Sequence, residues 1–110
     1  MNGKPQKPKR IPGPGAERAI MLDLSDELAE YLTTVSKKLA PVLGGKDADY
    51  EGFCFIARDR KTQKIRAHVS MHVPNDRVST TYNGSDVEDL ERFVYAWANH
   101  TFINKMVRAK

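Results

Sequence analysis

Apolar and polar residues alternate most clearly over residues 64–73. This period of two is that of a β-strand with one buried face and one polar face. Residues 53–59 precede it across a short loop, and a Pro74-Asn75-Asp76 turn follows it, so the pattern predicts a hairpin continued by a third strand. The apolar face of the long strand carries Ile65, Ala67, Val69, Met71 and Val73, and the polar face carries Lys64, Arg66, His68, Ser70 and His72.

Two stretches repeat apolar residues at spacings of three and four and predict helices. The first begins at Ser25, and the second at Ser85, where Glu88 completes a capping box. Ahead of the first helix, Ile20, Leu22 and Leu24 alternate, which indicates a short strand. The apolar stripes are Leu28, Tyr31, Leu32, Val35, Leu39 and Val42 in the first helix, and Val87, Leu90, Phe93, Val94, Trp97 and Thr101 in the second.

The resulting order, β-α-β-β-β-α, predicts a two-layer α+β domain. Both helices lie on one face of an antiparallel sheet of three to four strands. The helix, three-strand, helix part is also the order of double-stranded-RNA-binding domains. Where those domains carry lysines at the start of the second helix, this chain has Asp86, Glu88 and Asp89. Membership of that family is therefore not inferred.

The chain of 110 residues, 40% of them hydrophobic, suits a single core, which we assign to residues 18–110. Residues 1–17 hold four of the six prolines and three of the seven glycines. Such a segment cannot bury enough apolar surface to order itself, so a disordered tail is expected. No run is long or apolar enough for a membrane span or a signal peptide, and the one cysteine lies in an apolar run. A soluble, cytoplasmic protein is the expectation.

The chain shows no arrangement of residues typical of an active site. His68 and His72 would lie about 13 Å apart on a strand, too far for one metal ion. Cys54 and His68 could be cross-strand neighbours in one register, but a buried, inert thiol is the simpler interpretation. We therefore expect no enzyme activity, no metal and no cofactor.

The net charge of +4 comes from the N-terminal segment. Residues 1–18 carry five basic residues and one acidic residue, and the remainder is balanced. A basic tail is a common feature of nucleic-acid binding, since each cation near a phosphate releases a counterion. A second basic concentration falls on the hairpin, whereas acidic residues gather at the starts of the two helices. On the hairpin Arg58, Arg60, Lys61, Lys64, Arg66 and Arg77 outnumber Asp59 and Asp76.

Two hairpin registers are open. With a loop of four residues, 60–63, Asp59 pairs with Lys64, and Phe55 shares the polar face with Arg66 and His68. That mixture suits the stacking of bases and the binding of phosphates. With a loop of three residues, Phe53 and Phe55 join the core. Burial favours the second register, because exposed phenylalanines reduce solubility.

The leading hypothesis is a non-enzymatic, sequence-independent nucleic-acid-binding protein that prefers single strands and uses the open sheet face and the tail. DNA and RNA are both open as ligands. The alternative is a protein-interaction module, an adaptor or a small inhibitor, that acts through its helix surfaces. The residues expected to bind nucleic acid are Lys4, Lys7, Lys9, Arg10, Phe55, Arg58, Arg60, Lys61, Lys64, Arg66, His68 and Tyr82.

The second helix carries a further apolar stripe of Tyr95, Phe102 and Met106. This stripe lies well away from the sector that faces the sheet, so one helix cannot bury both stripes on the same surface. A homodimer built in part on the stripe is expected, because two-fold pairing is the commonest way to bury such a patch. In the alternative, the first helix covers the stripe within the monomer.

Overall fold

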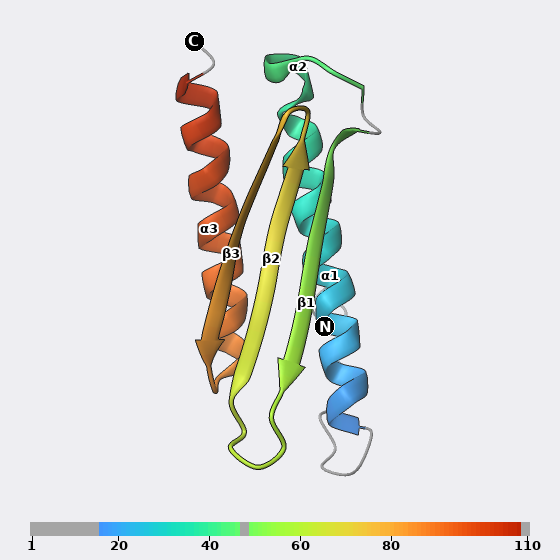
Figure 1. The fold of residues 1–110 in the computed structure, drawn as a ribbon, viewed down its shortest axis with the longest axis vertical. Helices are drawn as coiled ribbons and strands as arrows, with labels where there is room; N and C mark the ends of the chain where they lie inside the picture. The colour runs from blue at the N-terminus through green and yellow to red at the C-terminus, as the bar shows by residue number, and fades with distance from the viewer. Residues whose placement is uncertain (1–15, 47–48, 109–110) are drawn as a thin grey trace, which may run out of the picture.

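The computed structural model describes residues 16–46 and 49–108 (Figure 1). Its three strands form one antiparallel sheet in the order β1-β2-β3, and both long helices lie behind the same face of it. The predicted α+β class, with an antiparallel sheet and two helices, is confirmed. The elements are α1 (Ala16–Lys38), α2 (Ala40–Leu43), β1 (Glu51–Arg58), β2 (Ile65–Val73), β3 (Asp76–Gly84) and α3 (Val87–Arg108).

The strand expected over Ile20, Leu22 and Leu24 is wrong, because these residues belong to α1. Met21, Leu24 and Leu28 are buried at helical spacing, whereas Leu22 is 60% exposed. The short alternation is equally compatible with the first turns of a helix, and packing of α1 on the sheet decides between them. Within the described residues the sheet has three strands, and the elements run α1, α2, β1, β2, β3, α3.

The core lies between the sheet and the two long helices. Leu28 and Leu32 of α1, Val69 of β2, and Leu90 and Val94 of α3 are fully buried in it. A smaller cluster closes one end of the domain, where Phe102 and Met106 of α3 pack against Leu39, Tyr50 and Val73. The apolar stripes predicted for the two helices are the faces that pack on the sheet, apart from Val42, which is exposed.

Helix α1 packs directly on the backbone of strand β1 at Gly52. A Cβ atom at Gly52 would lie 2.3 Å from the Cβ of Leu32 and 2.4 Å from the backbone nitrogen of Thr33. The backbone N–H of Gly52 donates a hydrogen bond to Thr33 Oγ1 at 2.8 Å. The helix therefore rests directly on the backbone of β1 and satisfies a donor of this edge strand.

The hairpin between β1 and β2 has the four-residue loop. Arg58 pairs with Ile65, and the backbone N–H of Asp59 donates to the carbonyl of Lys64 at 2.8 Å. Burial favoured the other register, and that preference is wrong. In the observed register Cys54 and Ile56 face the core, while Phe53 and Phe55 are 55% and 59% exposed.

Two side-chain contacts lie near the two ends of α3. Helix α3 is capped by Asp86, whose Oδ1 accepts from the backbone N–H of Glu88 at 2.9 Å, so the cap expected at Ser85 is wrong. At the other end, Lys105 donates to Asp76 Oδ2 at 2.5 Å and ties the C-terminal part of α3 to the turn between β2 and β3. The first contact fixes the start of α3, and the second holds its C-terminal part against the sheet.

Replacing Gly52 with Ala should destabilise the protein by about 2 to 3 kcal/mol, because the new methyl group forces α1 away from β1. Chemical unfolding followed by circular dichroism measures the change. Ser79→Ala, on the exposed face of the opposite edge strand, is the control and should stay within about 0.5 kcal/mol of wild type. A Gly52→Ala protein as stable as this control would contradict the close packing.

The ion pair of Asp76 predicts a pH dependence. The hydrogen bond from Lys105 holds the pKa of Asp76 below its usual value, and the bond from the backbone N–H of Arg77 has a smaller effect in the same direction. The pair therefore stabilises the fold above the unfolded pKa of Asp76, and this contribution is lost as the pH falls through its lowered, folded pKa. Because the Asp76 side chain is 48% exposed and screened by solvent, Asp76→Asn should cost less than about 1 kcal/mol at neutral pH.

Urea unfolding at a series of pH values provides the measurement for Asp76→Asn. The difference between wild type and variant should shrink toward zero in acid. A difference that grows as the pH falls would contradict the assignment.

Candidate nucleic-acid interface

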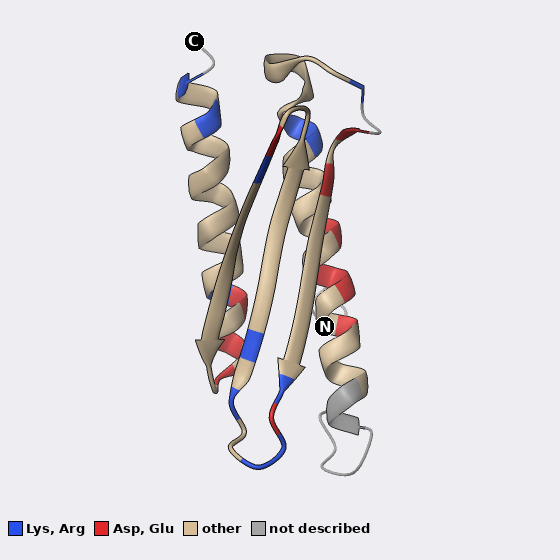
Figure 2. Cartoon of the chain, viewed as in Figure 1, with Lys and Arg blue, Asp and Glu red and all other residues tan. Residues whose placement is uncertain are grey.

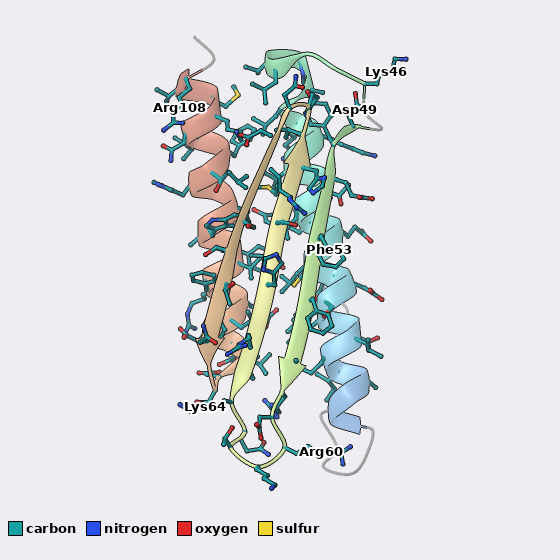
Figure 3. All side chains as sticks on the ribbon, viewed as in Figure 1. Lys46, Asp49, Phe53, Arg60, Lys64 and Arg108 are labelled. Atoms are coloured by element: carbon teal, nitrogen blue, oxygen red, sulfur yellow. The ribbon has the colours of Figure 1, made fainter. Side chains whose placement is uncertain are left out.

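The sheet leaves one face free of helices in the described part of the chain, and we call it the open face. The strand registers place three rows of side chains across it. Figure 3 shows this face toward the reader, with Phe53 on β1 and Lys64 and Arg60 at the hairpin end. The open face consists of Glu51, Phe53, Phe55 and Ala57 from β1, Arg66, His68, Ser70 and His72 from β2, and Arg77, Ser79, Thr81 and Asn83 from β3.

Two phenylalanines stand next to each other on the open face. Phe53 and Phe55 point to the same side of β1, about 6.8 Å apart along the strand. Phe55 pairs with His68, and Phe53 pairs with Ser70. Large, exposed aromatic rings on a sheet surface have no structural role in the core, so they mark this surface as a candidate binding site.

Basic residues gather at one end of the open face, which we call the basic end: Arg60, Lys61, Lys64 and Arg66. All four are exposed, and Arg66 Nε donates to Asn83 Oδ1 at 3.3 Å across the sheet. Figure 2 shows the basic residues at this hairpin, whereas acidic residues lie along α1 and at the start of α3. The basic concentration expected at the hairpin and the acidic start of the second long helix are present, but the acidic residues expected at the start of the first helix lie in the middle of α1.

Asp59 shapes the loop that carries the basic end. Its Oδ1 accepts from the backbone N–H groups of Lys61 at 2.8 Å and Thr62 at 3.1 Å. These two hydrogen bonds hold the pKa of Asp59 below its usual value, and the bond from Thr62 has the larger effect. The carboxylate therefore remains charged at neutral pH. Asp59 thereby orders the loop and holds Arg60 and Lys61 at its tip.

Two residues expected at the interface lie elsewhere. Tyr82 faces the helices at 7% exposure and donates a hydrogen bond to Asp89 Oδ2 at 3.0 Å. Burial is the main cause that raises the pKa of its hydroxyl, and the hydrogen bond to Asp89 raises it further. Arg58 shares the side of β1 that carries the buried Ile56 and is itself half-buried. Stacking by Tyr82 is therefore excluded in this fold, and Arg58 lies off the open face.

The remaining expected site residues divide into two groups. Phe55, Arg60, Lys61, Lys64, Arg66 and His68 come together on the open face and its basic end. Lys4, Lys7, Lys9 and Arg10 fall outside the described residues. Phe53 was not among the residues expected to bind. It lies two residues before Phe55 and therefore on the same side of the strand, and this spacing would have identified it.

Cys54 faces the core and is paired with Val69, while His68 points to the opposite side of the sheet. Cys54 and His68 are therefore not cross-strand partners, and Cys54 is buried as expected. Burial raises the pKa of the Cys54 thiol to about 12. Among the described residues there is also no group of three or more His, Cys, Asp or Glu side chains that could hold a metal ion.

The stripe of Tyr95, Phe102 and Met106 lies partly inside the monomer. Tyr95 makes an edge contact with Tyr31 of α1, with the ring centroids 4.6 Å apart. Phe102 and Met106 are half-buried against the end cluster. Helix α1 and the end cluster thus cover much of the stripe within the monomer. The homodimer stays a prediction, and an uncovered stripe is no longer an argument for it.

Comparison of the chain with models of protein families, with curated proteins and with solved structures finds no match. None of the helices that the structure describes combines the length and apolar character needed to cross a membrane. The geometry of the open face is therefore the basis for a functional proposal.

The Cys54 thiol should be inert in the native protein, because burial keeps it protonated at ordinary pH. At about pH 8 an aromatic disulfide reagent should leave native protein unlabelled over minutes and label it fully in concentrated guanidinium. Fast labelling of the native state would contradict the burial of Cys54.

Proposed function

We propose that this protein binds single-stranded nucleic acid through the open face, without sequence preference and without catalysis. The observation that carries the proposal is the pair Phe53 and Phe55, exposed beside His68 and Arg66. Aromatic rings on a sheet surface flanked by cations are the common equipment of proteins that bind single strands.

Stacking explains both the affinity and the choice of single strands. Each base stacked on an aromatic ring contributes about 1 to 3 kcal/mol, and every base has a flat face to offer. In a duplex those faces are covered by neighbouring base pairs. Phe53 and Phe55, about 6.8 Å apart, are spaced to hold two consecutive, unstacked bases of an extended strand.

Charge sets the path of the strand along β1. Lys64, Arg66 and the loop of the basic end attract phosphates, while Asp49 and Glu51 lie at the opposite end of β1 and repel them. The backbone of the bound strand should therefore leave the aromatic pair over the hairpin. In this proposal Lys4, Lys7, Lys9 and Arg10 add phosphate contacts of their own, and a homodimer would add a second open face.

Removing both aromatic rings tests the proposal directly. Phe53→Ala/Phe55→Ala should weaken binding of a fluorescent oligothymidine of about 15 nucleotides at least tenfold, because two bases no longer have a ring to stack on. Fluorescence anisotropy provides the measurement. The matched control, Leu22→Ala/Val107→Ala, removes two exposed apolar side chains from the helices and should bind like wild type.

Three results would contradict the proposal: equal binding by the phenylalanine variant, equal weakening in the control, or tighter binding of a duplex of the same length. Failure of wild type to bind any oligonucleotide would favour the protein-interaction alternative.

The basic end is tested by salt dependence. Lys64→Gln/Arg66→Gln should reduce the slope of log affinity against log salt by about 0.7 for each phosphate of the single strand that these side chains neutralise in wild type. Lys37→Gln/Arg92→Gln removes the same charge from exposed positions on the helices and should leave the slope nearly unchanged. An equal reduction in both variants would mean that net charge alone governs binding.

A further inference from the structure

We infer that binding at the open face is coupled to protonation of His68, so that affinity rises as the pH falls. The inference rests on the proposed function and concerns the regulation of the same site. Histidine is the side chain whose charge ordinarily changes between about pH 5 and 8. His68 stands at the centre of the open face, paired with Phe55 on β1 and with Thr81 on β3.

Among the described residues, the strand positions that surround His68 on the open face include no carboxylate. Arg66 is the one charged side chain among them, two residues away on β2 and on the same face. A proton gained by His68 therefore adds to the positive charge of Arg66 beside the aromatic pair, with no acidic side chain to neutralise it. The complete set of neighbouring positions is Phe53, Phe55 and Ala57 on β1, Arg66 and Ser70 on β2, and Ser79, Thr81 and Asn83 on β3.

His72 provides an internal comparison. It lies on the same face of the same strand but is paired with Glu51 on β1 and with Arg77 on β3. A proton on His72 is therefore offset by the carboxylate of Glu51, and the charges of its two cross-strand neighbours, Glu51 and Arg77, cancel. The two histidines of the open face differ in their charged neighbours: His72 has a carboxylate beside it and His68 does not, so we expect His68 to transmit protonation to a bound phosphate.

Linkage fixes the direction of the effect. If the charged form of His68 binds the phosphate backbone better, the bound strand favours that form. The gain in affinity is then present at low pH, where a histidine side chain carries a proton, and it is lost as the pH rises. Asp59 and Asp76, whose pKa values are lowered, stay charged throughout this range and do not obscure the change.

The experiment measures the affinity of an oligothymidine, whose bases do not titrate in this range, from about pH 8 to about pH 5.5 at constant ionic strength. Wild type should gain up to about tenfold, the change that corresponds to one pKa unit. His68→Gln should remove this gain, and His72→Gln, the matched control, should keep it. His68→Arg, with a permanent charge, should bind tightly and independently of pH.

A second readout separates a direct phosphate contact from a structural effect. The salt slope of wild type should be steeper at low pH than at high pH by about 0.7, one single-strand phosphate contact, and His68→Gln should show no such difference. Circular dichroism confirms that each variant remains folded at both ends of the range.

The outcomes distinguish this inference from the proposed function. Binding by wild type with a flat pH profile overturns the role of His68 and leaves the open-face proposal standing. A pH-dependent gain that survives in His68→Gln, or disappears in His72→Gln, also overturns it. No binding by wild type at any pH overturns both.

Discussion

The contact of α1 with the backbone of β1 at Gly52 is the constraint on which the rest of this structure depends. No side chain fits between the strand and Leu32 of the helix, since even a Cβ atom would lie 2.3 Å from Leu32 Cβ. A shift of one residue along β1 would place Phe53 at this point. The contact therefore fixes which side of β1 faces the helices, and it turns Phe53 and Phe55 outward.

The same contact determines which side chains lie on the core side of the sheet and which lie on the open face. Groups that could have reacted or stacked, the Cys54 thiol and the Tyr82 ring, lie on the helix side, where burial raises their pKa values. Aromatic and basic side chains meet on the other side, next to a loop that Asp59 orders by hydrogen bonds to backbone N–H groups. The fold thus leaves aromatic and basic side chains exposed on the open face and buries the Cys54 thiol.

Much of this fold is predictable from sequence because its strongest elements are long and periodic. The β2 strand and the core stripe of α3 follow from their apolar spacing alone. The start of α1 does not, because three alternating residues fit both a strand and a helix. The expected hairpin register was wrong because it rested on burying the two phenylalanines. It did not consider that Gly52, which has no side chain, allows α1 to pack on that side of β1. Tyr82 was also expected to stack on bases, although its pairing with Ala67 places it on the core side of the sheet.

The most direct test of binding at the open face uses the four phenylalanines of the chain, two on each side of the sheet. Nuclear magnetic resonance of the ring protons during titration with an oligothymidine reports which rings meet a base. We predict large shifts for Phe53 and Phe55 and small ones for Phe93 and Phe102, which pack against the core. Binding that leaves Phe53 and Phe55 unmoved, or that shifts the two core rings instead, would contradict this prediction.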